Sequence, residues 1–393
     1  TMGANAVMKL IDRNGLNPRN IGRMYLGTES ALDGAKPTAT YIVDMLTQRY
    51  SERYGEDCFR NCDVVDMTFA CIGAVDALQS TLDFIRLNPE KKAIVVATDN
   101  AKYDLNSTGE YTQGAGAIAL LITAKPRILA FSKEVGVASE GVFDFFKPRS
   151  SISKNALLKT NENPEWFGVL ENEIAIYKEQ PVFDGQYSNQ CYINRICEAY
   201  QHYKEMTNQN GIIFENWENI IMHLPYCFQA RRTFVEIYSN EYKITDDLKT
   251  ISKSQEYIDF VTKTIYPSEI ASSEIGNMYT GSIFLGLLST LCFHFKNKTD
   301  LTNKKFGFLA YGSGSKSKVF EAEVQENWLS VIEQIDLFET LAKSYEIDFI
   351  TYEKLHKKEL KTLVLSPKNE FVLAYIEKEN PVLTGARYYK FIS

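Results

Sequence analysis

Cys71 stands where a thiol could act as a nucleophile. The short apolar segment 62–65 before it is typical of a buried strand, and residues 75–85 after it repeat apolar side chains at the spacing of a helix. A thiol at a helix start faces unpaired N–H groups, which can lower a cysteine pKa from about 8.5 toward roughly 3.5–7.5. The pattern predicts a nucleophilic Cys71, against the alternative of a cysteine that only fills the core.

Glu29 and His223 follow two further predicted strands. Residues 21–30 read as a buried strand that ends in a polar loop holding Glu29, and residues 218–223 read as a strand that ends in histidine. A helix follows His223, so the unit repeats the plan of strand, Cys71 and helix. Two such units would set a histidine opposite the cysteine, as nucleophilic catalysis requires. A solvated glutamate and a core histidine are the alternatives.

Three polar loops supply further candidates. Residues 100–113 are rich in turn formers and precede a strand that opens at Gly114, where glycine indicates close backbone approach or a surface hairpin. Residues 275–282 gather polar groups at the start of an apolar helix, where carbonyl oxygens are stabilised. Residues 306–315 run from a strand into a glycine loop, which either presents N–H groups to an oxyanion or forms a plain hairpin turn.

Composition excludes several classes of protein. The chain has 393 residues, of which 45% are hydrophobic, and a net charge of −7, so it has ample core and no electrostatic footprint for nucleic acid. No apolar run is long enough to cross a bilayer. Seven scattered cysteines favour neither a disulfide framework nor a metal site, and we expect a cytoplasmic protein.

Strands alternate with helices along the chain, which predicts an α/β fold whose sheet is largely parallel at first. We expect one unit over residues 1–393. Its first half covers about 1–130 and its second half about 213–393. Between them, residues 131–212 look like an insertion with an irregular part and a long helix over 189–206.

Six motifs, in order, resemble those of hydroxymethylglutaryl-CoA synthases. They are Gly27-Thr28-Glu29-Ser30, Phe69-Ala70-Cys71, residues 109–117, Met222-His223-Leu224-Pro225-Tyr226, residues 276–282 and Tyr311-Gly312-Ser313-Gly314. The shorter bacterial enzymes of the mevalonate pathway are the most similar. The resemblance implies a thiolase-like fold, with two similar halves and mixed sheets sandwiching helices, a homodimer, and no metal or cofactor beyond the substrates acetyl-CoA and acetoacetyl-CoA.

The resemblance also implies roles for single residues. Cys71 would carry the acetyl group, Glu29 would remove a proton from its methyl carbon, and His223 would hold the acetoacetyl group and protonate its oxygen; water would then release 3-hydroxy-3-methylglutaryl-CoA. The positions that match the substrate channel are Tyr103, Thr112, Ser188, Arg232, Asn277, Tyr279 and Ser313. Asp99 and Asp144 match supporting carboxylates.

The chain departs from the family at several points. Ile72 replaces a tyrosine beside the nucleophile, and Phe228 replaces a lysine that would contact CoA. The first strand and helix of the first half are missing by this alignment, which would leave an unpaired central strand edge. The alternatives are a polyketide β-branching synthase that uses acyl carrier protein thioesters, a ketoacyl synthase III, against which Glu29 argues, and a non-catalytic homologue.

Overall fold

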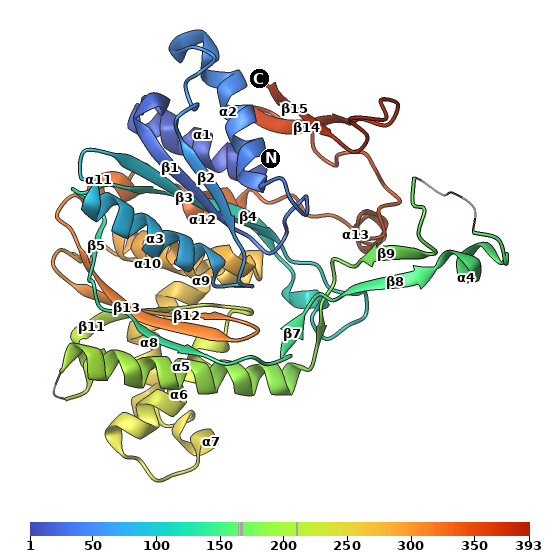
Figure 1. Cartoon of the computed structure of the whole chain (residues 1–393). Coiled ribbons are helices and arrows are strands. Elements are labelled where there is room, and N and C mark those ends of the chain that lie inside the picture. The colour runs from blue at the N-terminus through green and yellow to red at the C-terminus, as the bar shows by residue number, and fades with distance from the viewer. Residues whose placement is uncertain (164, 166–167, 210) are drawn as a thin grey trace.

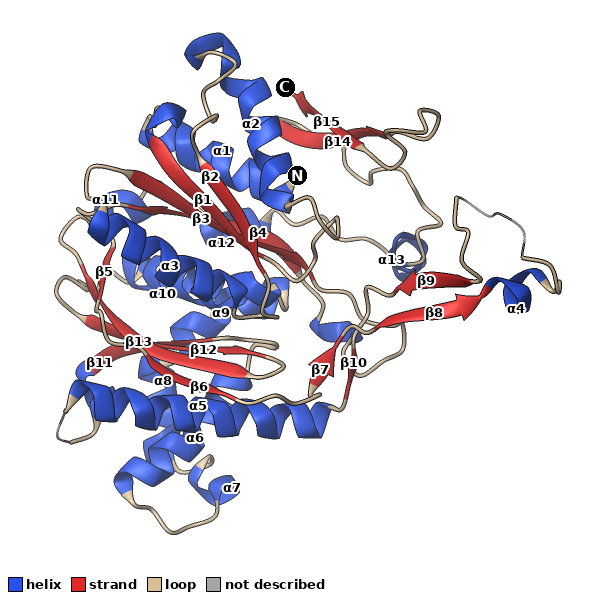
Figure 2. Cartoon of the chain, in the orientation of Figure 1, coloured by secondary structure: helices blue, strands red, loops and turns tan. Residues whose placement is uncertain are grey.

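Two β-sheets are stacked face to face with helices outside and between them, as Figure 1 shows. The computed structural model describes residues 1–163, 165, 168–209 and 211–393. Figure 2 separates the alternating layers of helix and strand by colour. None of the helices within these ranges is both long enough and apolar enough to cross a membrane.

The first sheet has the strand order β2-β1-β3-β4. Its strands are β1 (Ile21–Gly27), β2 (Asp63–Met67), β3 (Lys92–Asn100) and β4 (Ala115–Ile122). β1 runs parallel to both of its neighbours, while β4 returns antiparallel to β3. The carboxyl ends of β1, β2 and β3 therefore meet at one edge of the sheet, where the loops after them can form a site.

The second sheet repeats this plan. It holds β11 (Trp217–Met222), β12 (Lys305–Gly312), β13 (Lys316–Val324), β5 (Leu129–Phe131) and β6 (Gly136–Ser139). β11 is parallel to β12, which is antiparallel to β13, and β5 and β6 both pair with the outer edge of β13. In the first sheet, no described strand pairs with the outer edge of β4. This open edge is therefore the outer edge of β4, at the side of the sheet. The expectation of an unpaired central strand edge was wrong, because the central strand β1 pairs on both sides.

Helices fill three layers around the two sheets. The outer layer on the first sheet has α1 (Met2–Asn14) and α2 (Thr38–Tyr54). The middle layer has α3 (Gly73–Leu87), α10 (Ser282–Lys296) and α9 (Tyr266–Ile275). The outer layer on the second sheet has α5 (Gly185–Thr207), α6 (Gln229–Tyr242), α7 (Leu248–Ile251) and α8 (Gln255–Thr264). Val75 of α3 and Leu291 of α10 lie in one buried cluster with Val95 and Phe308 from the two sheets. This shared core joins the halves.

A two-stranded ribbon projects from the body of the molecule (Figure 1). It is built from β7 (Phe145–Phe146) paired with β10 (Val182–Phe183), and from β8 (Arg149–Ser153) paired with β9 (Glu173–Tyr177), with α4 (Lys154–Leu158) beyond β8. The expectation of an irregular segment here was wrong, because its strands are too short and polar to show a period of two. β6 and α5 pack on the second sheet, so only part of 131–212 stands apart; the division into halves stays a prediction.

The last part of the chain lies along the first half. α11 (Trp328–Ile332) and α12 (Leu337–Ala342) pack on α10, and α13 (Phe349–His356) follows. The hairpin of β14 (Glu370–Ile376) and β15 (Arg387–Ile392) rests against α1 and α2. Its buried Phe371 and Tyr389 join the core beneath those helices.

Candidate active site

A tight turn between β2 and α3 carries Cys71. Ala70 adopts the left-handed region at φ 38°, which costs an ordinary residue roughly 1–2 kcal/mol. A Cβ on Gly73 would lie 2.6 Å from the carbonyl oxygen of Met67, and one on Gly27 would lie 2.2 Å from the backbone nitrogen of Ala74. The two glycines therefore let the turn close tightly against β1, which fixes the thiol at the sheet edge.

The pKa of the Cys71 thiol is raised well above its usual value. Burial is the main cause, and the carboxylates of Glu29 and Asp99 add to it, whereas Lys147 acts in the opposite sense. The expectation that the helix start would lower this pKa was wrong, because the loss of solvent and the neighbouring negative charge outweigh the helix dipole. The thiol is protonated at neutral pH.

Glu29 is buried next to this thiol. Only 7% of its side chain is exposed, and burial raises the pKa of its carboxyl from 4.5 to about 7. Asp99 fixes the loop: one carboxylate oxygen accepts hydrogen bonds from the Glu29 N–H at 2.9 Å and the Thr28 hydroxyl at 2.8 Å, and the other accepts from Thr280. A solvated loop position, the alternative drawn from the sequence, was wrong.

Lys147 is a site residue that the sequence did not indicate. Its Nζ lies 3.4 Å from Oε1 of Glu29 and 4.8 Å from the ring centroid of Tyr279. Lys147 follows β7 in a segment without regular periodicity, so no pattern of spacing marks it out. Only its place directly after the aromatic pair of β7 brings it to Glu29.

His223 is buried at the end of β11. Its Nδ1 is hydrogen-bonded to the Ser282 hydroxyl, whose oxygen also accepts the N–H of Leu224 at 3.3 Å. Burial lowers the pKa of the imidazole to about 3, so the ring is neutral at physiological pH. Because Ser282 can donate to Nδ1, this arrangement favours the tautomer with its proton on Nε2.

A cavity of about 250 Å³ lies at this site, and neither Glu29 nor Lys147 is among the residues that line it. Cys71 and His223, from equivalent units of the two halves, both line it. Six of the predicted channel residues also line it: Tyr103, Thr112, Ser188, Asn277, Tyr279 and Ser313. Arg232 does not, but its Nη1 donates a hydrogen bond to the hydroxyl of Tyr226, which does. Unpredicted aromatic walls come from Phe145, Phe183, Tyr192 and Tyr311. Among the residues that the structure describes, no three His, Cys, Asp or Glu side chains are grouped to hold a metal.

The loop with Asn277 is held by close backbone contact. The Asn277 N–H donates to the carbonyl of Thr112 at 2.8 Å, and a Cβ on Gly114 would lie 2.6 Å from the carbonyl oxygen of Ile275. Of the two interpretations of Gly114, close approach was correct. The contact aligns the loop before β4, which carries Thr112, with the loop before α10, which carries Asn277, on one wall of the cavity.

Asp144 supports the glycine loop between β12 and β13. It accepts hydrogen bonds from the Tyr311 hydroxyl at 2.6 Å and from the Gly314 N–H at 2.7 Å. The Ser315 N–H donates to the carbonyl of Glu140 at 2.6 Å. Two N–H groups of this loop therefore already have acceptors, which argues for the hairpin turn and against an oxyanion site built from them.

α13 is hydrogen-bonded to the loop that carries Tyr103. The hydroxyl of Tyr352 donates to Glu110 at 2.9 Å and accepts from Gln113 at 2.8 Å. Nε2 of His356 lies 2.8 Å from the carbonyl oxygen of Tyr103. A helix from the C-terminal part thus holds one wall of the cavity.

Comparison with known proteins identifies the family. Residues 1–127 match the family model of the hydroxymethylglutaryl-coenzyme A synthase N terminal, and residues 174–259 and 249–366 match that of the C terminal. A curated hydroxymethylglutaryl-CoA synthase from Haloferax volcanii is 31% identical over 91% of this chain and 79% of its own length. The chain belongs to the hydroxymethylglutaryl-CoA synthase family. The enzyme of that name from Enterococcus faecalis is 27% identical over 92% of this chain and 80% of its own length.

Solved structures of the family share the fold. MvaS in complex with 3-hydroxy-3-methylglutaryl coenzyme A is 25% identical, with a TM-score of 0.80, over 100% of this chain and 87% of its own. The HMG synthase of the curacin biosynthetic pathway, at 21% identity and a TM-score of 0.77 over the same shares, has the same fold. The thiolase-like architecture expected from the motifs is confirmed, and the chain is an acyltransferase of the mevalonate pathway that condenses acetyl-CoA with acetoacetyl-CoA.

Proposed function

We propose that Cys71, Glu29 and His223 divide the condensation among them as nucleophile, base and hydrogen-bond donor. The observation that carries this proposal is their convergence: a buried thiol and a buried imidazole line one cavity, and a carboxyl with a pKa of about 7 lies beside the thiol. A base works best when its pKa is near the working pH.

The first step moves the acetyl group to Cys71. The sulfur forms a bond to the acetyl carbon as the bond from that carbon to the CoA sulfur breaks, and the thiol proton ends on the released CoA. The raised pKa of Cys71 keeps the thiol protonated in the resting enzyme, so its proton must leave as the acetyl group is transferred.

The second step forms the carbon–carbon bond. The Glu29 carboxylate takes a proton from the acetyl methyl, and the electron pair left behind attacks the ketone carbon of acetoacetyl-CoA. His223 donates its Nε2 proton to the ketone oxygen, which becomes a hydroxyl, and the ring then regains a proton equivalent to the one that Glu29 took from the methyl group. One proton is removed and one is added, so the step takes up no net proton. Water then cleaves the thioester and restores the thiol.

The remaining cavity residues bind the thioester arms. Tyr103, Thr112, Ser188, Asn277, Tyr279 and Ser313 line the channel. Arg232, next to Tyr226 at the channel wall, supplies positive charge for the phosphates of CoA. Exposed Phe228 stands one residue before the start of α6 and adds no charge there, so Arg232 carries this contact. No resident cofactor enters these steps.

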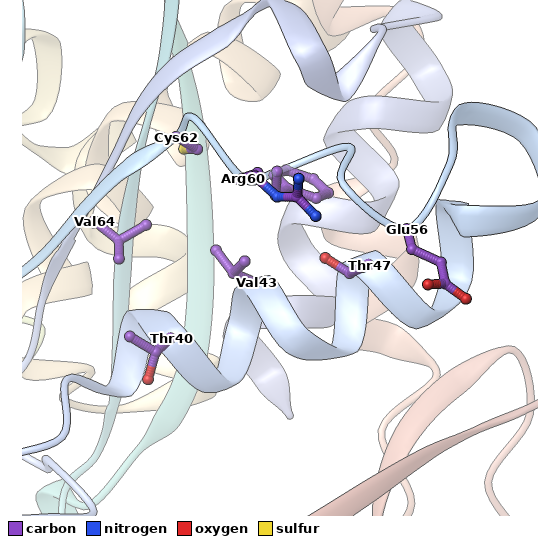
Figure 3. Close-up of a pocket in the computed structure, with 8 residues that line it drawn as sticks. Thr40, Val43, Thr47, Glu56, Arg60, Cys62 and Val64 are labelled. Atoms are coloured by element: carbon purple, nitrogen blue, oxygen red, sulfur yellow. The ribbon is translucent and has the colours of Figure 1, made fainter.

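The proposal extends to the assembly and location of the enzyme. β2 is an edge strand, and beside it a hollow of about 340 Å³ is lined by Val43 and Thr47 of α2 and by Cys62 and Val64, as Figure 3 shows. A free strand edge beside a partly apolar hollow suits a second copy of this chain, which would make a homodimer. All seven cysteines are free, which fits a reducing, cytoplasmic location.

Mass spectrometry tests the chemistry directly. The intact protein is mixed with acetyl-CoA, digested for peptide mapping, and in a parallel sample chased with acetoacetyl-CoA. We expect an acetyl adduct on Cys71 that disappears on the chase as 3-hydroxy-3-methylglutaryl-CoA forms. An adduct on another cysteine would contradict the assignment. No adduct with acetyl-CoA, but one with an acetylated carrier protein, would show that the donor is a carrier protein.

Light scattering of the same sample tests the dimer. A monomer at micromolar concentration would contradict it.

A further inference from the structure

Lys147 is held in the active site by contacts on two sides. Its ammonium group lies 3.4 Å from the Glu29 carboxylate and 4.8 Å from the face of the Tyr279 ring. Its side chain is 15% exposed and that of Glu29 is 7% exposed, so solvent screens this ion pair weakly. A surface ion pair contributes little, but a shielded one can set the charge state of its partner.

The segment that bears Lys147 is anchored. Asp144 is tied to the hydroxyl of Tyr311 and to the N–H of Gly314 in the second half. Between Asp144 and Lys147, β7 pairs with β10, and Phe145 packs edge-on against Tyr279 with ring centroids 6.0 Å apart. The backbone before the lysine is therefore held by the second sheet, by β10 and by the loop that carries Tyr279, which limits the positions that the ammonium group can take.

The groups around Glu29 come from several elements. Asp99 of β3 adds negative charge, and the thiol of Cys71 would add more if it lost its proton. The phenols of Tyr103 and Tyr279 also lie near Glu29 and Cys71. Burial and Asp99 favour the protonated acid, whereas Lys147 is the cation that favours the carboxylate. The balance between these groups decides whether Glu29 can act as a base at neutral pH.

We propose that Lys147 is a positioning residue for the base, and that its ammonium group keeps the Glu29 carboxylate ionised and oriented toward the acetyl group on Cys71. This inference rests on the proposed roles of Glu29 and Cys71. The proton of Lys147 stays on its nitrogen throughout. When Glu29 takes the methyl proton, the negative charge passes to the enolate oxygen, and the ammonium group remains close by.

The test separates the two half-reactions in a series of variants. Lys147→Met keeps the length of the side chain and removes the charge, and Lys147→Arg keeps the charge. Lys318→Met is the matched control, because Lys318 is also 15% exposed and also paired, but with Asp76 at 2.7 Å instead of with Glu29. Acetylation of Cys71 is followed by intact mass, and condensation is followed from pre-formed acetyl-enzyme in single turnovers between pH 5.5 and about 9, a range that brackets the Glu29 pKa.

We expect the condensation rate of the wild type to rise with a midpoint near pH 7. In Lys147→Met the midpoint should move up by at least one pH unit, so that condensation at pH 7 falls at least about fivefold while acetylation changes little. Lys147→Arg should restore the midpoint, and Lys318→Met should keep the wild-type profile.

Two results would overturn the inference. The first is an unshifted midpoint in a Lys147→Met protein that still acetylates Cys71, and the second is an equal loss of both half-reactions that Lys147→Arg does not rescue. If the wild type acetylates and condenses normally, either result removes the role of Lys147 alone. A wild type that never acetylates Cys71 would remove the proposed function and this inference together.

Discussion

At the scale of single residues, the sequence indicated the reacting groups but not their charge states. Cys71 and His223 follow strands of repeated units, and that repetition was visible as a pattern. The raised pKa of Cys71 and the lowered pKa of His223 follow from burial, which depends on side chains distant in sequence. Lys147 was missed for the same reason, since it reaches Glu29 across 118 positions. The catalytic roles themselves stay predictions.

Variants of the nucleophile and the base should fail at different steps. Cys71→Ala should abolish the acetyl-enzyme, because no sulfur remains to form the thioester. Glu29→Ala should still acetylate Cys71 but should lose at least about 100-fold in condensation, the usual contribution of a general base. Intact mass and product formation, measured on the same samples, distinguish the two. Equal loss of acetylation in both variants would contradict these roles.

The buried carboxyl of Glu29 should also affect stability. Its pKa is about 7 in the folded protein and 4.5 in an ordinary setting, so between these values the folded state binds more protons than the unfolded state. The free energy of unfolding should therefore fall as pH rises from 4.5 to 7, by roughly 3 kcal/mol for this group. Glu29→Gln should lack this loss, and denaturant titrations at several pH values should show the two proteins diverging through that window. If the free energies of unfolding of the two proteins changed in parallel with pH, this effect of Glu29 would be contradicted.

At the scale of elements, the long strands of the two sheets were predicted, whereas β5, β6, the helices α7 to α9 and the projecting ribbon were not. β1, β3 and β12 are long and apolar, so their signal is strong. β7 and β10 have two residues each, which is too short for a local pattern to show, and Phe146 pairs with Val182, 36 positions later, only through tertiary contacts. Predicting such short elements needs knowledge of the tertiary contacts.

Gly114 gives a test of how neighbouring loops align the cavity wall. Gly114→Ala would place a methyl within 2.8 Å of backbone atoms of residues 275–277, which cannot move aside as a side chain can. We expect a loss of about 1–3 kcal/mol in the free energy of unfolding and a raised KM for acetoacetyl-CoA. Gly141→Ala is the control, since nothing lies within 4 Å of its added methyl. Similar values for the two variants would show that the contact is unimportant.

At the scale of the whole molecule, the two halves meet through helices rather than through strands. The duplicated plan was predicted from the two strand–residue–helix units, but the pairing of β5 and β6 with β13 was not, because nothing in a sequence says which strand edge a short segment will join. The middle layer carries both α3 and α10, and they share one buried cluster with strands of both sheets.

Leu291 offers a test of how much the middle layer contributes to the free energy of unfolding. Its side chain is 2% exposed between the sheets, so Leu291→Ala should lower the free energy of unfolding by about 2–5 kcal/mol. Leu87→Ala, at a position that is 83% exposed, should change it by less than about 0.5 kcal/mol. Urea denaturation of both variants provides the comparison. A small effect at Leu291 would mean that the halves are held together elsewhere.

The contacts of α13 with the Tyr103 loop make the C-terminal part a reporter of substrate binding. Tyr352 and His356 join this helix to Glu110, Gln113 and the backbone of Tyr103. Linkage is reciprocal, so a bound thioester that orders the loop must also favour the docked helix. Undocking the helix must then lower the affinity for the thioester by the same factor. Amide hydrogen exchange in α13 should therefore slow when the cavity is filled, which would allow occupancy to be measured without a label on the substrate.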